Sequence, residues 1–461
     1  MGTVSNSSQG HAGKMTDGNV TRTGAAKRRI SRSKPLWRAY ISLLLFMVIY
    51  CARPEDWIPG LSGVPLAKIA GVIALLALIF SLPHIRRRLP REVFFLAILI
   101  GQLFLASAMS SVWRGGALGA TIDFAKILLV VIVMSTAVNT INRLRHLIFI
   151  QAASVAVIAV ITVWKSHHII GRLEGILGGN YSNPNDLALA IVISLPLCLA
   201  LLFLARNWVW KVAWALAMIV MSYAVFLTSS RGGFFALITT TAFCLWAYAV
   251  QGRRRYLLVF AALLGAVLWQ SSSGLLRDRL NGTLGAKDEV ASSYASAQQR
   301  QQLFWKTVEV TEQNLLFGVG PGNFEVISGS WHVSHNAFTQ MSSEGGVPAL
   351  AFYSLILWCG FKNVGTTTRV ARGQRELMVL ARALRATLAG YVVGSLFAST
   401  AYQFFPYFLV AYTTALLWIA KKTSNQTGAP EKANDLLPEE ESVVATAETE
   451  VSWHGFSIRE V

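Results

Sequence analysis

The sequence changes from hydrophilic to apolar at residues 334–340, SHNAFTQ, and 344–348, EGGVP. A long hydrophilic segment precedes them, and an apolar run follows and continues to about residue 361. A titratable histidine, amides and hydroxyls therefore stand together where a loop meets an apolar element. The rest of the sequence predicts a membrane-embedded helical body that holds this loop at its edge.

The composition is typical of a membrane protein rather than of a soluble globular domain. Hydrophobic residues make up 54% of the chain and charged residues only 14%. Apolar stretches recur with roughly the 20 residues that a helix needs to cross a bilayer. The net charge of +18 would suggest a nucleic-acid partner for a soluble protein. Here the basic residues fall in short loops between apolar runs, which indicates membrane topology, so we expect a lipid bilayer and no nucleic acid as partner.

Twelve apolar segments are predicted to be transmembrane helices, so the expected fold is an all-α polytopic membrane protein. They are residues 36–51, 65–82, 92–112, 119–137, 144–164, 186–205, 209–228, 233–250, 255–270, 336–361, 380–399 and 402–420. Lys and Arg cluster in every even-numbered loop and just outside the first and last segments. By the positive-inside rule, these loops and both termini are cytoplasmic, and the odd-numbered loops face the other side.

Two of the outward loops are long, residues 165–185 and 271–335. In the second, Leu303, Phe304 and Trp305 occur among Gln, Lys and Glu. This mixture is typical of a helix that lies half buried in the membrane interface. The late loop is thus expected to cover the outward surface of the helical body.

Composition also predicts the domain organisation. Residues 1–35 are polar and basic, and residues 421–461 are acidic, so both are expected to be disordered cytoplasmic tails. The transmembrane domain is expected between them, at residues 36–420.

His335 is the first candidate for chemistry. Its imidazole, with an ordinary pKa near 6.5, is suited to take a proton from a hydroxyl at neutral pH. Asn336 and Glu344 are candidate supporting groups, although a continuous helix would turn Glu344 away from His335. The structural alternative is an ordinary histidine at the membrane interface.

Three arginines in outward loops are candidates for binding an anion. Arg231 precedes a pair of glycines at the start of a helix, where free N–H groups and the helix dipole favour phosphate and glycine allows close approach. Arg172 stands in the first long loop and Arg300 in the second. The alternatives are a headgroup contact for Arg231, an ion pair with Glu174 for Arg172, and a solvated helix face for Arg300.

The sequence favours neither a metal nor a cofactor. His332 lies near His335, but no clustered carboxylates supply further ligands. The four cysteines lie in or beside apolar runs without Cys-x-x-Cys spacing. The glycine-rich residues 318–322 lack the following Lys-Ser/Thr of a nucleotide loop.

Together these residues resemble the bacterial O-antigen ligase and polymerase superfamily of polytopic glycosyltransferases. The motifs that carry the resemblance are SRGG at 230–233, Arg300 followed by Trp305, GVGPGNF at 318–324, SHN at 334–336 and EGG at 344–346. Twelve helices with a long late loop agree with it, so the resemblance spans roughly residues 36–420.

The resemblance implies a GT-C-type, metal-independent enzyme at the periplasmic face of a bacterial inner membrane. Such an enzyme moves a glycan from undecaprenyl pyrophosphate to a hydroxyl of lipid A-core, of another glycan or of a protein, with inversion at the anomeric carbon. The resemblance further implies that Arg231, Arg172 and Arg300 hold the departing pyrophosphate. His335 would be the general base or the group that orients the acceptor.

A polytopic transporter or a flippase for lipid-linked oligosaccharides is the alternative function, and a membrane scaffold without catalysis is a third. A twelve-helix transporter predicts two similar halves joined by a long central loop. Here the loop after the sixth segment is short and the long loop follows the ninth. The glycosyltransferase is therefore the favoured hypothesis.

Overall fold

The computed structural model describes residues 34–434, except residues 59, 62–63, 82–88, 167, 170–171, 176–180, 272–275, 277–290 and 330–331. The predictions of disorder for residues 1–33 and 435–461 lie outside the described residues, while residues 421–434 of the second predicted tail are helical. The chain divides into two compact units, Met1–Lys421 and Lys422–Val461. All the described helices lie in the first unit, except that the last part of α17 (Phe405–Asn434) belongs to the second.

The long helices form where the apolar segments predict them. They are α2 (Lys34–Ala52), α4 (Leu66–Ser81), α5 (Arg91–Met109), α6 (Arg114–Ala137), α7 (Ile141–Lys165), α8 (Pro184–Leu204), α9 (Trp208–Leu227), α10 (Arg231–Cys244) with its π-helical continuation η2 (Leu245–Val250), α11 (Tyr256–Ser271), α15 (Ala337–Val370), α16 (Arg375–Ser395) and α17 (Phe405–Asn434). Among the described residues, nine helices are long and apolar enough to cross a membrane. The all-α polytopic class is confirmed, while the count of twelve spans and the GT-C relationship stay predictions.

Smaller elements connect these helices. They are α3 (Pro54–Trp57), α13 (Ala291–Gln313), α14 (Phe324–Ile327) and the strands β1 (His168–Ile169) and β2 (Arg172–Leu173). The strands form a two-stranded antiparallel sheet in which Ile169 pairs with Arg172. This short hairpin fixes part of the first long loop beside the end of α9.

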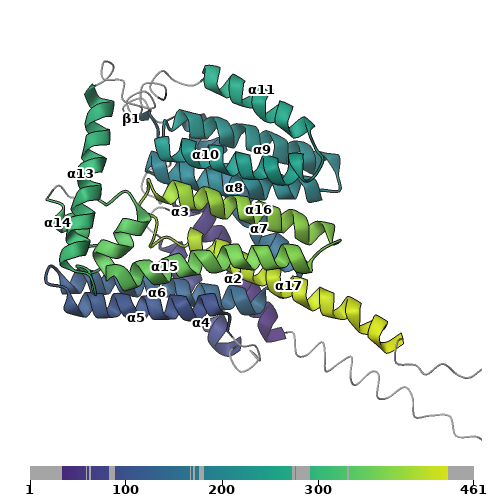
Figure 1. Ribbon diagram of the computed structural model, residues 1–461, viewed down its shortest axis with the longest axis horizontal. Coiled ribbons are helices and arrows are strands. Elements are labelled where there is room, and N and C mark those ends of the chain that lie inside the picture. The colour runs from purple at the N-terminus through teal and green to yellow at the C-terminus, as the bar shows by residue number, and fades with distance from the viewer. Residues whose placement is uncertain are drawn as a thin grey trace, which may run out of the picture. The chain divides into compact units, whose positions relative to one another are not determined.

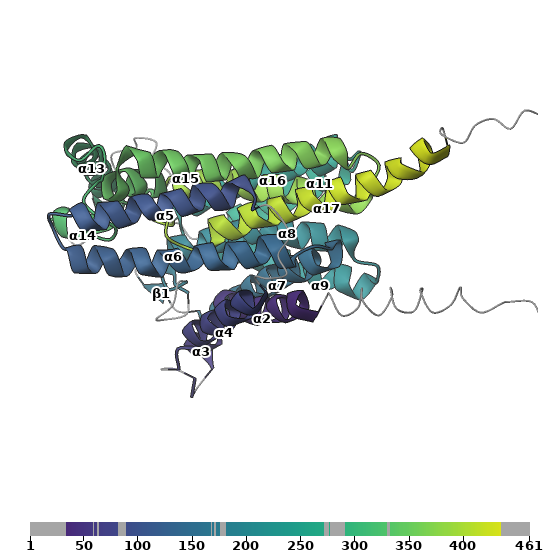
Figure 2. The same cartoon turned by 90° about the horizontal axis from the view of Figure 1, so that it is seen from below.

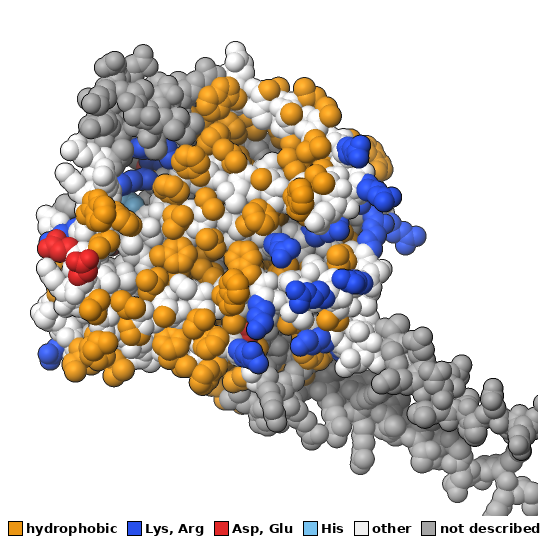
Figure 3. Space-filling model, in the orientation of Figure 1, with side chains coloured by type: hydrophobic (Ala, Val, Ile, Leu, Met, Phe, Trp, Pro, Cys, Tyr) orange, Lys and Arg blue, Asp and Glu red, His pale blue; other side chains and the backbone are white. Residues whose placement is uncertain are grey.

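The long helices lie side by side as a bundle (Figures 1 and 2). α8 is its centre, because it contacts α7, α9, α10 and α16, and 83% of its most apolar window is buried. α15 joins α16 to α5, which packs against α6. In Figure 3, hydrophobic side chains spread over the outer face of the bundle, and most of the visible Lys and Arg side chains lie toward one end. This distribution agrees with the positive-inside argument.

α13 crosses the long helices at one end of the bundle (Figure 1). Leu303 and Val310 on one of its faces are buried against Val319 and Phe324. Trp305 on the same helix is 61% exposed. The expectation of a half-buried helix in the late loop is therefore confirmed, and its position in the membrane interface stays a prediction.

The helices around the candidate site differ in detail from the prediction. The segment predicted to run to residue 399 ends at Ser395, because the amides of Leu396 and Phe397 bond to the carbonyls of Val393 and Gly394 in a tight turn. Residues 396–404 therefore form a loop. α15 is interrupted at Gly346, whose φ is 77°. A side chain at Gly346 would lie 2.5 Å from the Leu316 carbonyl oxygen, so only glycine fits this break.

Candidate functional site

A cavity of about 240 Å³ lies where α10 begins, α13 crosses the bundle and α15 is about to start. It collects side chains from four parts of the chain that are far apart in sequence. Its lining residues are Arg231, Phe235, Arg300, Gln301, Phe304, Ser334, His335, Asn336, Leu396 and Phe397. The cavity thus combines two guanidinium groups and an imidazole with a wall of apolar side chains.

Arg231 is held rigidly at the first position of α10. Ser230 is the N-cap, and its Oγ accepts a hydrogen bond of 3.2 Å from the Gly233 amide. Ser229 before it adopts a left-handed φ of 47°, which turns the chain into the helix. Arg231 itself is only 8% exposed. The guanidinium therefore enters the cavity from a fixed helix end.

The two glycines that follow Arg231 serve helix packing, which corrects the expectation that they admit a phosphate. A side chain at Gly232 would lie 2.4 Å from Cβ of Phe397. One at Gly233 would lie 2.5 Å from Cβ of Ala188 on α8. The space that the glycines leave is therefore occupied by protein, and α10 can pack closely against α8 and the loop after α16.

Arg172 does not line the cavity, although the sequence predicts that it binds the same anion. Its Nε donates to the Thr228 carbonyl at 3.0 Å, and its Nη2 donates to Oδ1 of Asn185 at 3.0 Å. The same Oδ1 accepts a hydrogen bond of 2.8 Å from the Ser230 hydroxyl. Arg172 therefore ties the start of α8 to the turn that presents Arg231.

His335 precedes α15 and does not belong to it. Its φ of 55° lies in the left-handed region, which is uncommon for residues other than glycine. The backbone N–H of His335 donates to Oγ of Ser399 at 2.8 Å. Ser399 Oγ also lies 3.3 Å from the Ser334 hydroxyl. The loop after α16 thus holds the histidine in a left-handed backbone conformation that is unfavourable for a residue other than glycine.

Burial and neighbouring positive charge lower the pKa of His335 from its ordinary value of 6.5 to about 4. Burial is the main cause, and Arg300 and His332 add repulsion of a bound proton. The imidazole is therefore neutral at pH 7 in the empty site. A neutral imidazole has a lone pair available to accept a proton.

Asn336 is the N-cap of α15. Its Oδ1 accepts hydrogen bonds from the amides of Phe338, at 2.9 Å, and Thr339, at 3.2 Å. These bonds satisfy helix N–H groups that would otherwise lack partners. The side-chain oxygen is therefore used to start the helix, while the residue still contributes to the cavity wall.

Glu344 lies apart from His335, on the buried side of α15. It is 3% exposed and faces the loop of Gly322 and Phe324, with the Tyr402 hydroxyl beside its carboxyl group. The break in α15 comes after it, at Gly346, so the break does not redirect Glu344 toward the histidine. Its Oε2 belongs to the buried atoms of the described chain that lack a hydrogen-bond partner.

The glycine-rich residues 318–322 pack against the first part of α15. The amide of Val319 donates to the Ser343 carbonyl and that of Gly320 to the Glu344 carbonyl, both at 2.9 Å. Nδ2 of Asn323 anchors the loop to the Ser110 hydroxyl at 2.8 Å. A side chain at Gly318 would lie 2.5 Å from the backbone of Glu344, so this glycine allows the loop and α15 to pack backbone against backbone.

The described residues contain no group of three or more His, Cys, Asp or Glu side chains that could share a metal ion. Two of the polar groups that line the cavity are guanidinium groups, which suit an anionic ligand.

Sequence reasoning missed three residues that shape the site. Phe397 and Ser399 lie in residues that the apolar pattern assigned to a transmembrane helix, so their role beside Arg231 and His335 was hidden. The polar pair Ser399-Thr400, at the end of the predicted segment 380–399, is the signal that could have indicated a loop. Asn185 is the third, and its link to Arg172 becomes visible only in the tertiary structure.

Residues 216–354 match the family described as O-antigen ligase. The match begins within α9, ends within α15 and includes Arg231, Arg300 and His335. A comparison with curated proteins gives no match to this chain.

Proposed function

We propose that this membrane protein transfers a glycan from undecaprenyl pyrophosphate to an acceptor hydroxyl. The match of residues 216–354 to the O-antigen ligase family supports this proposal and places the chain in the O-antigen ligase and polymerase superfamily. The observation that carries this proposal is the meeting of Arg231, Arg300 and His335 at one cavity. The site faces the periplasm in this proposal, because it lies in the loops opposite the basic ones.

The two arginines are suited to the leaving group of this reaction. When the bond between the anomeric carbon and the pyrophosphate oxygen breaks, negative charge develops on that oxygen. Fixed guanidinium groups stabilise such charge, since they present several N–H donors in a geometry that fits phosphate oxygens. Arg231 is held by its helix end and Arg300 by α13, so little reorganisation is needed when the charge appears.

His335 is suited to the acceptor. The acceptor oxygen attacks the anomeric carbon from the side opposite the pyrophosphate, which inverts the configuration at that carbon. Its proton passes to the neutral imidazole as the new bond forms, and the pyrophosphate leaves on its lipid with the bonding electron pair. Protons and charge balance without a metal ion, and we include metal independence in the proposal.

Binding of the donor would make His335 a stronger base. In the empty site Arg300 lowers the pKa of His335. A pyrophosphate beside Arg300 would offset that positive charge and let the pKa rise toward its ordinary value. The histidine would thus gain affinity for a proton when the donor is in place.

The remaining candidates act indirectly in this scheme. Arg172 and Asn185 position the turn that carries Arg231, in place of the direct pyrophosphate contact that the sequence predicts. Asn336 starts α15 behind the histidine.

We assign Glu344, together with Tyr402, to the packing beneath the site. Burial and the neighbouring carboxyl raise the pKa of Tyr402 well above its ordinary value, so it remains a neutral hydroxyl.

Replacement of Arg231 by alanine in a host whose surface glycan depends on this gene tests the proposal. The matched control is Arg206→Ala, which removes the same charge from an exposed position in the loop after α8. We expect Arg231→Ala to reduce the glycan product severely at normal protein abundance and Arg206→Ala to leave it intact. Normal product from Arg231→Ala would contradict the proposal.

The form of the glycan that accumulates identifies the subtype. Long chains that remain on the lipid carrier indicate a ligase that loads lipid A-core or a protein. Single repeat units indicate a polymerase that extends the glycan. Both outcomes use the same cavity, because only the acceptor differs.

A further inference from the structure

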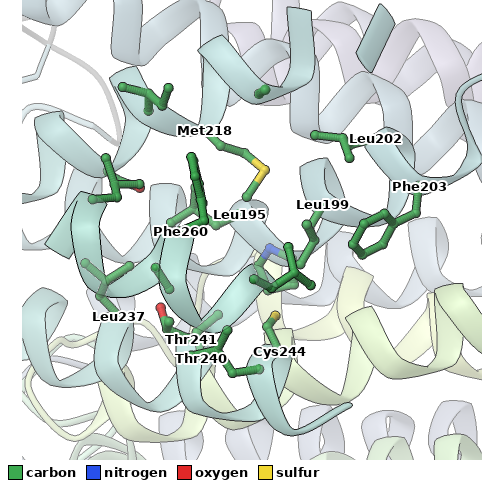
Figure 4. A pocket seen from close by; sticks show the side chains of 18 of the residues that line it. Leu195, Leu199, Leu202, Phe203, Met218, Leu237, Thr240, Thr241, Cys244 and Phe260 are labelled. Atoms are coloured by element: carbon green, nitrogen blue, oxygen red, sulfur yellow. The ribbon is translucent and has the colours of Figure 1, made fainter. Parts of the chain in front are cut away.

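A second cavity, of about 320 Å³, lies among α8, α9, α10, η2 and α11. Figure 4 shows Leu199, Met218, Cys244 and Phe260 around its open centre. Its lining is almost entirely apolar, with Ser222, Thr240 and Thr241 among the few polar side chains. A cavity of this kind suits a hydrocarbon chain and offers too few donors for a sugar or a phosphate.

The cavity extends away from the glycan-transfer site. Arg231 is the first residue of α10, and η2 ends at Val250. Twenty helical residues at 1.5 Å each separate these points by roughly 30 Å. Phe203 and Tyr256, which also line the cavity, lie at this far end. The cavity therefore reaches the end of the bundle that carries the basic cluster of residues 253–255.

Arg254 stands at this end of the cavity. Its guanidinium carbon lies 4.0 Å from the centroid of the Phe203 ring. Its Nη1 is among the buried side-chain atoms of the described chain that have no hydrogen-bond partner. A buried guanidinium N–H without an acceptor is costly, so the geometry calls for an acceptor from outside the chain. Arg253 and Arg255 on either side are exposed and strengthen the positive field.

We propose that this cavity binds one anionic phospholipid of the leaflet next to the basic loops. One acyl chain occupies the apolar cavity, and the headgroup phosphate accepts a hydrogen bond from Nη1 of Arg254. Guanidinium groups favour phosphate oxygens, and basic pockets between transmembrane helices on this side of a membrane bind lipid headgroups. The lipid site does not require the glycan-transfer reaction, and only the exclusion of the donor's polyprenyl chain rests on the proposed function.

The polyprenyl chain of the donor is the competing occupant. A donor whose pyrophosphate lies at Arg231 has its charged group about 30 Å from this end, so it cannot supply the acceptor for Arg254. A phospholipid of the adjoining leaflet presents its phosphate at the required depth. The charge at Arg254 therefore favours the phospholipid.

Native mass spectrometry of the full-length protein, titrated with phosphatidylglycerol or with phosphatidylcholine of the same acyl chains, tests this site. We expect one tightly bound phosphatidylglycerol and weaker phosphatidylcholine binding. Arg254→Ala should weaken phosphatidylglycerol binding about tenfold, as expected for the loss of one hydrogen bond to a charged group. The control Arg206→Ala removes an exposed arginine from the same end of the bundle and should leave the affinity unchanged.

A second variant tests the acyl chain separately. Ser222→Phe would fill part of the cavity without changing the charge, and we expect it to remove the tightly bound lipid as well. Equal affinity of the wild type and Arg254→Ala for phosphatidylglycerol would overturn the proposal. Tight binding of phosphatidylglycerol by Ser222→Phe would also overturn the proposal. So would displacement of the bound phosphatidylglycerol by an uncharged polyprenol.

Discussion

The backbone N–H of His335 donates a hydrogen bond to the hydroxyl of Ser399, 2.8 Å away. This bond joins the end of the late loop to the loop between α16 and α17. It also holds His335 at a left-handed φ of 55°. The position of the histidine beside Arg231 and Arg300 therefore depends on a residue 64 positions along the chain.

Replacement of Ser399 by alanine is expected to lower the rate of glycan transfer about fivefold, the size of one lost hydrogen bond of ordinary strength. The reason is that His335 loses the acceptor that stabilises its strained backbone. Ser399→Thr keeps a hydroxyl and should keep most of the rate. Equal rates for Ser399→Ala and the wild type, at equal protein abundance, would show that this contact does not position the histidine.

The pH dependence of kcat/KM should report the lowered pKa of His335. The free enzyme should remain active from pH 7 down to about pH 5 and lose activity near pH 4, where the imidazole gains a proton. His332→Gln removes one of the positive groups that disfavour this proton, so it should move the acid limb to higher pH. An acid limb near pH 6.5 in the kcat/KM profile of the wild type would contradict this account, because it would mean that neither burial nor positive charge lowers the pKa of His335.

The same pKa shift has a consequence for stability. Between pH 6.5 and about pH 4, the unfolded chain binds a proton at His335 that the folded protein does not bind. The free energy of unfolding should therefore fall as the pH falls through this interval. His335→Gln should lose less stability over the same interval, as measured by thermal unfolding at pH 7 and pH 4.5.

Gly232→Ala should disturb the site through packing. The added Cβ would lie 2.4 Å from Cβ of Phe397, which lines the cavity next to Arg231. Overpacking of this kind costs about 1–3 kcal/mol, and here it would also displace the loop that holds His335. Gly101→Ala is the matched control, because its Cβ would meet nothing within 4 Å and alanine favours the helix. A lower thermal midpoint and a lower transfer rate are expected for Gly232→Ala alone.

Arg172 should affect transfer only through Arg231. Arg172→Ala is expected to lower the rate about tenfold in the wild type, since the Asn185 and Thr228 contacts of the turn are lost. In an Arg231→Ala background the same change should have little further effect, because coupled residues are not additive. Full additivity in this double-mutant cycle would instead indicate that Arg172 binds the pyrophosphate itself.

The apolar pattern predicted the helices well, because each long segment must form the hydrogen bonds of its backbone N–H and C=O groups within itself inside a bilayer. It failed at residues 396–399, where Leu396 and Phe397 are apolar but line a cavity instead of extending a helix. Arg231, Arg300 and His335 could be selected because most of the basic residues belong to the opposite, basic loops, which leaves few in the outward loops. The roles of Gly232 and Arg172 could not be predicted from the sequence. Their partners, Phe397 and Asn185, are brought near them only by folding.

The most direct test of the proposed reaction is a single-turnover assay with purified protein in proteoliposomes, a lipid-linked glycan on undecaprenyl pyrophosphate and its acceptor. The wild type should convert the donor, and His335→Ala should convert it about 10²–10⁴ times more slowly, the usual contribution of a general base. Donor binding by His335→Ala should persist, because Arg231 and Arg300 remain in the cavity. Transfer by His335→Ala at the wild-type rate would contradict the assignment of this cavity as the site of glycan transfer.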